Sequence, residues 1–165
     1  MDELLDLVNG NDEVIGEVWK SKANSDPKLV HREVSVYVFD KEDRLLMGQR
    51  SFTKKVYPGV WAESAAGHVG KNEEPETAAH RELNEEMGFD TELKFLKKVI
   101  SRYPNETHFT YCYVGSYEGE KIKIQKEEIE NVRFTKRSEY NQLYPNPDKY
   151  IKEGMDFVID IWNTK

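Results

Sequence analysis

The stretch from Gly67 to Phe89 constrains the fold and chemistry of this chain more than any other part of its sequence. It reads GHVGKNEEPETAAHRELNEEMGF. On a helix, where successive residues are rotated by about 100°, Glu82, Glu85 and Glu86 fall within about 100° of one another. Three carboxylates on one face repel each other, so the pattern predicts a positive ion among them. Hard divalent cations such as Mg²⁺ or Mn²⁺ prefer oxygen ligands of this kind.

The flanking residues indicate where this helix begins and ends. Pro75 fits the first helical position, where its missing N–H costs nothing. Gly88 fits the left-handed residue that commonly follows a helix, so the helix is predicted to run from Pro75 to about Met87. Leu83 and Met87 lie about a third of a turn from the carboxylates. We therefore expect these two side chains to face the core.

Seven identities in this stretch resemble the signature of the Nudix hydrolases. The matching residues are Gly67, Glu73, Arg81, Glu82, Glu85, Glu86 and Gly88. An acidic solvated helix with Arg/Glu pairs would explain the charges but not the two glycines. Phe89 departs from the aliphatic residue usual in that family, yet it keeps an apolar anchor. The resemblance implies an α/β fold, the Nudix α/β/α sandwich with a mixed β-sheet between helices.

The same resemblance implies a diphosphohydrolase that depends on Mg²⁺ or Mn²⁺. Such an enzyme cleaves a nucleoside diphosphate linked to another moiety, or a related organic diphosphate. The family pattern implies that the metal ligands are Glu82, Glu85 and Glu86, with Arg81 completing the catalytic set. Arg81 and Glu73 would orient the ligand carboxylates without touching the metal. Gly67, a further candidate ligand, is expected to let the chain turn where a side chain would obstruct the metal.

The general base and the substrate are left open by the sequence. A glutamate of the signature or a carboxylate on a later loop can be the base in this family. Glu127 and Glu128 lie in such a segment, but the same pair equally fits a solvated turn. Nucleoside triphosphates, nucleotide sugars, ADP-ribose, dinucleoside polyphosphates, capped RNA ends and prenyl diphosphates all suit one metal site. A Nudix domain that only binds a ligand is a further class, and the complete signature argues against it.

A second resemblance is to the type I isopentenyl diphosphate isomerases, which share the Nudix fold. It rests on residues from Leu29 to Phe89, among them His31-Arg32, Phe39-Asp40, Leu45-Leu46, Arg50, Lys54-Lys55, Pro58-Gly59-Val60-Trp61 and Gly67-His68. The isomerases need a cysteine just before the Gly-His pair, where this chain has Ala66. They also use a glutamate in a later strand, where matching on Cys112 gives His108 and Thr110, with Glu106 out of register. These departures favour the hydrolase.

The isomerase resemblance also bears on ligand binding. Arg50, Lys54 and Lys55 occupy one loop and are expected to bind the diphosphate of the substrate, although three solvated cations are the plainer alternative. His31 and His68 match histidines that bind a metal in the isomerases. They are therefore candidates for a second metal site, against the alternative of two ordinary polar residues.

Composition narrows the class of protein. The 165 residues suit a single domain, expected to span residues 1–165 with an N-terminal hairpin at about residues 1–20. The net charge of −7 makes long nucleic acid an improbable partner and leaves a small diphosphate as the expected one. Cys112 is the single cysteine, and the sequence shows no signal peptide or membrane span, so a cytoplasmic location is expected. Many relatives are dimers, so a homodimer is a further expectation that no residue establishes.

Alternation of apolar and polar residues predicts the remaining elements. The expected strands are Glu3–Leu7, Val14–Trp19, Val34–Phe39, Leu45–Gln49, Val60–Ala66, Leu93–Arg102, Phe109–Tyr117, Ile122–Ile124 and Val132–Thr135. Ser21–Pro27, Arg50–Pro58 and Gly67–Glu74 are expected loops. An amphipathic helix is predicted from Asp148 to Trp162.

Overall fold

The computed structural model describes residues 2–165 and places a mixed sheet at the centre of the molecule. The sheet has seven strands, in the order β5-β4-β3-β8-β7, with β6 beside β3 and β9 beside β4. Their bounds are β3 His31–Phe39, β4 Leu45–Arg50, β5 Trp61–Ala62, β6 Ala65–His68, β7 Leu93–Arg102, β8 Thr107–Ser116 and β9 Ile129–Thr135. β3 and β8 are parallel and the other pairs are antiparallel, so the predicted mixed sheet is confirmed.

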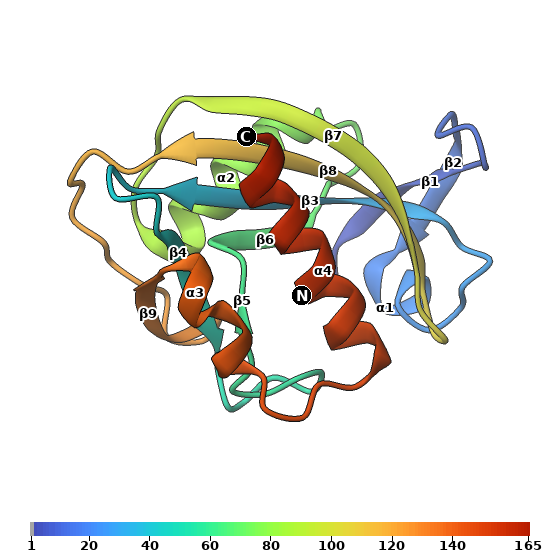
Figure 1. Ribbon diagram of the computed structural model, residues 1–165. Coiled ribbons are helices and arrows are strands. Elements are labelled where there is room, and N and C mark those ends of the chain that lie inside the picture. The colour runs from blue at the N-terminus through green and yellow to red at the C-terminus, as the bar shows by residue number, and fades with distance from the viewer. Residues whose placement is uncertain (1) are drawn as a thin grey trace.

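Two helices cover the two faces of this sheet (Figure 1). Helix α2 (Pro75–Met87) packs on one face and α4 (Lys149–Thr164) crosses the other. The expected α/β/α sandwich is therefore present. Gly88 ends α2 with a φ of 74°, the left-handed conformation that its sequence position predicts. Asp148 caps α4 by accepting a hydrogen bond from the Ile151 N–H at 2.8 Å.

The alternation along β3 determines where the polar groups gather. Val34, Val36 and Val38 are fully buried against the α2 side. Tyr37 and Phe39 face α4, together with the buried Trp162. Successive side chains of a strand point to opposite faces, so residues 31, 33 and 35 share the α4 face with Tyr37. The first half of β3 thus carries polar side chains on this face, and its second half carries core residues.

Strand β6 differs from the prediction for a physical reason. A single strand from Val60 to Ala66 was expected, but the structure has β5 and β6 separated by Glu63 and Ser64. The Ser64 hydroxyl donates to the Leu46 carbonyl at 2.6 Å and accepts from the Val38 N–H at 2.8 Å. It therefore fills the gap where β3 and β4 separate. Gly67 lies inside β6, so the expectation that it forms a loop or turn is wrong.

The segment from Ile122 to Ile124 is not a strand, contrary to prediction. The Lys123 N–H donates to the Met87 carbonyl at 2.8 Å, and the Gln125 N–H donates to the Glu86 carbonyl at 3.2 Å. The segment satisfies carbonyls at the end of α2, which would otherwise lack partners. The short helices α1 (Lys20–Ala23), which begins the expected Ser21–Pro27 loop, and α3 (Arg137–Tyr140), followed by the 3-10 turn Asn141–Leu143, were also not predicted.

The N-terminal segment forms an antiparallel hairpin beside the sheet (Figure 1). It consists of β1 (Leu4–Val8) and β2 (Val14–Trp19), and Leu5 bridges to Gly70 in the loop before α2. Asp12 in its turn has a φ of 65° and is buried among Arg32, Lys98 and Tyr111, which all contact its carboxylate. Among the helices of residues 2–165, none combines the length and the apolar character needed to cross a membrane.

Candidate functional site

Arg81 connects two of the predicted acidic residues on the side of α2 that faces β6. Its Nε and Nη2 donate to the two carboxylate oxygens of Glu73, both at 2.9 Å, and its Nη1 donates to Glu82 at 2.6 Å. Glu85 lies 3.5 Å from the same Nη1. Burial acts to raise the pKa of Glu73, but Arg81 and the Gly70 N–H together hold it below its ordinary value. The Glu73 carboxylate thus holds the Arg81 guanidinium in one orientation through two hydrogen bonds.

Strand β6 and α2 approach each other closely at Gly67. A Cβ atom added to Gly67 would lie 2.5 Å from Oε2 of Glu82 and closer still to its carboxyl carbon. The Arg81 guanidinium also donates to the carbonyl of the neighbouring His68 at 2.9 Å. The absence of a side chain at Gly67 therefore makes room for the Glu82 carboxylate. A side chain at position 67 would therefore obstruct the site, as predicted from the sequence, although the chain does not turn there.

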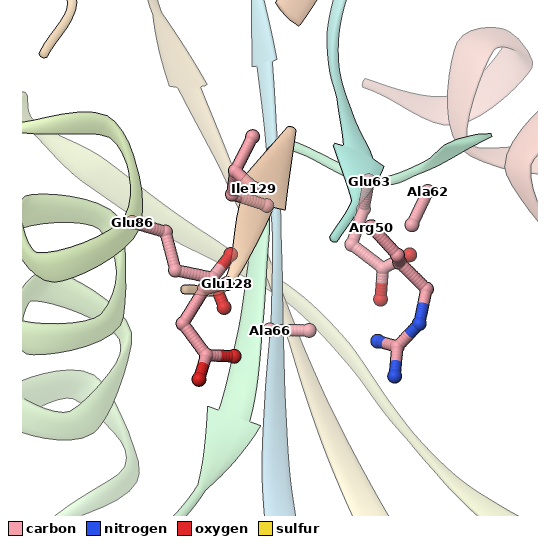
Figure 2. A pocket seen from close by; sticks show the side chains of 7 residues that line it. All are labelled: Arg50, Ala62, Glu63, Ala66, Glu86, Glu128 and Ile129. Carbon is pink, nitrogen blue, oxygen red and sulfur yellow. The ribbon is translucent and has the colours of Figure 1, made fainter. Parts of the chain in front are cut away.

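Glu86 lies at a small cavity of about 80 Å³, which is lined by this residue of α2 and by residues in and beside β4, β5, β6 and β9. Figure 2 shows Glu86 and Glu128 on one side of this cavity, Arg50 and Glu63 on the other, and Ala66 between them. Ala62 and Ile129 complete its wall. Burial raises the pKa of Glu86 well above its ordinary value, and the charges of Glu82, Glu128 and Glu63 raise it further.

The donor set at this point fits a hard divalent cation. Burial also raises the pKa of Glu82, with Glu85 adding to the effect and Arg81 opposing it. Carboxylates in this condition favour a bound proton or a bound cation, and oxygen donors of this kind suit Mg²⁺ or Mn²⁺. Of the three glutamates predicted to bind metal, Glu86 lines the cavity, whereas Glu82 and Glu85 lie beside Arg81 outside its lining.

Of the predicted basic loop and the predicted acidic pair, only Arg50 and Glu128 line the cavity. Arg50 lines it, and Lys54 forms an ion pair with Glu128 across its edge. Lys55 and Glu127 are exposed, and neither is among the residues that line the cavity. Glu63, which the sequence prediction missed, lines the cavity as well. Its signal in the sequence is weak, since it is a lone acid among small and apolar residues before Gly67.

A second polar cluster lies on the α4 face, at the start of β3. Glu33 is its centre, with His68 at 3.2 Å, His108 at 3.3 Å and His31 at 3.7 Å. The potential ligand atoms of His31, Glu33, Glu106 and His108 all lie within 4.8 Å of one another. The parallel pairing of β3 with β8 places His31 opposite His108, and the β3–β6 pairing places Glu33 opposite His68.

The chemistry of this histidine cluster fits a metal with nitrogen ligands. His31 is fully buried, and its Nδ1 lies 3.4 Å from the Leu29 carbonyl, which favours a proton on that nitrogen. Its Nε2 has no hydrogen-bond partner among residues 2–165, and neither does Nδ1 of His108. Burial lowers the pKa of His68 to about 4 and also lowers that of His108, although Glu33 opposes both shifts. Neutral imidazoles are the form that binds metals.

The structure also places the residues that distinguish the hydrolase resemblance from the isomerase resemblance. Ala66 lines the cavity beside Glu86, where the isomerases would place their cysteine. Cys112 is fully buried against α4, and burial, followed by the charge of Glu63, raises the pKa of its thiol to about 12. Thr110 is the residue of β8 paired with Glu33. No thiol therefore lines this cavity within residues 2–165.

The chain belongs to the NUDIX domain family. The model of that family matches residues 29–154, which include all seven strands of the central sheet, α2, both polar clusters and the first part of α4. The sequence signature and the α/β/α sandwich agree with this assignment.

Curated relatives carry the name of the isomerase. The chain is 36% identical to isopentenyl-diphosphate Delta-isomerase 2 of Photorhabdus laumondii, over 91% of this chain and 87% of the relative. It is 35% identical to isopentenyl-diphosphate Delta-isomerase of Serratia proteamaculans, over 91% and 86%. The predicted similarity to the isomerases is therefore confirmed, and it extends well beyond residues 29–89.

Solved structures share the fold at lower identity. DR0079 from Deinococcus radiodurans has a TM-score of 0.70 at 22% identity, covering 81% of this chain and 83% of that one. The MutT protein from Methanosarcina mazei has a TM-score of 0.68 at 18% identity, covering 85% and 98%. The NUDIX domain of NrtR from Shewanella oneidensis, solved with ADP ribose, has a TM-score of 0.62 at 21% identity, covering 84% and 95%.

Proposed function

We propose that this protein is a Mg²⁺- or Mn²⁺-dependent hydrolase that cleaves a diphosphate linkage in a small organic substrate. The observation that carries the proposal is the arrangement on α2. There, Glu82 is held by Arg81, Glu86 lines the cavity, and the intervening glutamate lies within 3.5 Å of the same arginine. A bound Mg²⁺ would neutralise charge on the phosphate oxygens and position water.

The other residues near the cavity fit supporting roles. Arg81 and Glu73 would keep the ligand carboxylates oriented, because their paired hydrogen bonds fix the angle of the guanidinium. Arg50 and Lys54 would bind phosphate oxygens at the edge of the cavity. Lys55, which is exposed on the same loop, would add only long-range attraction.

Isomerisation of a five-carbon diphosphate is the second candidate function, and the names of the relatives favour it. Ala66 argues against it, since a methyl group cannot donate or accept a proton. Cys112 cannot substitute, because it lies in the core with a raised thiol pKa. This chain also lacks the isomerase glutamate, since β8 carries Thr110 and His108 at the matching positions.

The deciding experiment is a product-resolved screen with Mg²⁺. Nucleoside triphosphates, nucleotide sugars, ADP-ribose, dinucleoside polyphosphates and prenyl diphosphates would be tested with the wild type, Glu85→Gln and Glu86→Gln. We expect hydrolysis by the wild type and loss of turnover in both variants, with circular dichroism unchanged. Rearrangement of isopentenyl diphosphate without release of phosphate would instead support the isomerase. Turnover that survives Glu86→Gln would exclude the proposed metal site.

We also infer a second metal centre at the histidine cluster. Three imidazoles around Glu33, with Glu106 nearby, favour a borderline metal such as Zn²⁺, Mn²⁺ or Co²⁺ over Mg²⁺. The test is equilibrium dialysis with metal analysis, together with the visible spectrum of bound Co²⁺. His31→Gln should remove the site, and His80→Gln, at an exposed pair with Asp90, is the matched control. An equal metal content in all three proteins would contradict the inference.

Two smaller proposals concern the oligomeric state of the protein and the class of its substrate. A homodimer remains a prediction, which light scattering after gel filtration would test. The substrate is proposed to be a small-molecule diphosphate rather than long nucleic acid, because the chain carries a net charge of −7. Competition of substrate turnover by duplex DNA at low salt would contradict the second proposal.

A further inference from the structure

We infer that Glu63 is the general base that removes a proton from the attacking water. This inference rests on the proposed hydrolysis at the α2 glutamates. Glu63 lies between β5 and β6, on a different element from those glutamates and from Glu128. Its carboxylate projects into the cavity from the side opposite Glu86 (Figure 2).

The other carboxylates at the cavity are already engaged. Glu128 is paired with Lys54, so its charge is neutralised and one side of it is blocked. Glu86 has like charges around it and is assigned to the metal. No lysine, arginine or histidine nitrogen within residues 2–165 forms an ion pair with Glu63. Glu63 is thus the carboxylate at this cavity that is available to accept a proton.

The orientation of Glu63 is set by Ser35. The Ser35 hydroxyl donates to Oε1 of Glu63 at 3.0 Å, and it projects from the α4 face of β3. Among residues 2–165, Oε2 has no hydrogen-bond donor, so it remains free for water. Ala66 lies between Glu63 and Glu86, and its small side chain leaves the space open (Figure 2).

The cavity has a size that suits this role. A volume of about 80 Å³ exceeds the roughly 10–15 Å³ that one water needs by this measure. In the reaction, the water oxygen forms a bond to phosphorus while its proton passes to Oε2 of Glu63. The bridging P–O bond breaks, and the leaving phosphate oxygen keeps the electron pair. The summed change is the addition of one water across the linkage.

The test compares Glu63→Gln with Glu128→Gln, since both changes are isosteric and remove one charge from the same cavity. We expect Glu63→Gln to lower kcat by roughly 10²–10⁴-fold. KM and the Mg²⁺ dissociation constant, measured by calorimetry, should stay within about threefold of the wild type. Glu128→Gln should have the smaller effect on kcat. Ser35→Ala should lower kcat modestly without affecting metal binding, because it frees the carboxylate to rotate.

Three outcomes would overturn the inference, and they differ from failure of the proposed function. If Glu63→Gln keeps its kcat while Glu128→Gln loses it, the base is Glu128. If Glu63→Gln weakens Mg²⁺ binding as much as it lowers kcat, Glu63 is a metal ligand instead. If the melting temperature of Glu63→Gln falls with its activity, and Glu63→Asp restores both the fold and kcat to wild-type values, its role is structural. If the wild type cleaves no diphosphate, or Glu86→Gln stays active, the proposed function fails and the inference fails with it.

Discussion

Replacing Gly67 with alanine should disturb the predicted metal site by steric conflict alone. The new methyl carbon would lie 2.5 Å from Oε2 of Glu82, whereas ordinary contact begins at 3.4 Å. The carboxylate must therefore move by about 1 Å or more, against its 2.6 Å hydrogen bond to Arg81. Because these atoms end a flexible side chain, the cost is mainly the weakened charge-assisted hydrogen bond, about 1–3 kcal/mol of unfolding free energy. A displacement of about 1 Å in a catalytic group costs on the order of 10²-fold in rate.

Gly16→Ala is the matched control, because Gly16 also lies in a strand and a Cβ there would meet only Leu7, at 3.8 Å. That variant should be neutral or more stable by up to about 1 kcal/mol, since alanine loses less conformational freedom than glycine on folding. Urea unfolding gives the stability of both proteins, and calorimetry gives their Mg²⁺ affinity. Gly67→Ala should lose both stability and affinity. Equal unfolding free energies for the two variants, with unchanged Mg²⁺ affinity, would refute the argument from close approach.

Three further perturbations test separate parts of the structure. Arg81→Lys keeps the charge but cannot make the paired hydrogen bonds to Glu73, so we expect calorimetry to show Mg²⁺ binding weakened by about 10–100-fold. Asp12→Asn should lower the unfolding free energy by about 1–3 kcal/mol at pH 7, because it leaves Lys98 without its buried partner. Burial acts to raise the pKa of Asp12, but its cationic and hydroxyl partners hold it below 3.8. The difference between wild type and variant should therefore persist above about pH 4 and shrink as pH falls through the lowered pKa, which urea unfolding at several pH values would show. Cys112 should react with a thiol reagent only as fast as the protein unfolds, since burial raises its pKa to about 12; rapid labelling in the folded state would contradict its placement in the core.

The sequence predicted best the features that depend on neighbouring residues. Helix α2 runs from Pro75 to Met87 as expected, because a proline at its start and Gly88 after its end are both local signals. The predicted pattern also placed Arg81 beside the acidic face, where the structure shows it bound to Glu82. These elements could be predicted because their causes lie within a few residues of one another.

The sequence failed where distant segments satisfy one another. The break between β5 and β6 depends on Ser64 reaching two other strands, and no local pattern shows that. The histidine cluster was anticipated in part from His31 and His68, but Glu33 and His108 join it only through strand pairing. Glu63 was missed for the same reason, since its importance comes from Ser35 and the cavity rather than from its neighbours in sequence.

The four residues of β6 leave this strand almost no freedom to change. Ala65 and Gly67 face α2, where Ala65 is buried in the core and Gly67 makes room for Glu82. Ala66 and His68 face the opposite side, toward the cavity and the histidine cluster. Deleting Ala65 or Ala66 would turn the following side chains to the wrong face, placing the imidazole against Glu82 and the glycine opposite Ser35. Insertions and deletions should therefore be tolerated in the loops around β6 but not within it, and a deletion scan should show that metal binding at both proposed sites is lost together.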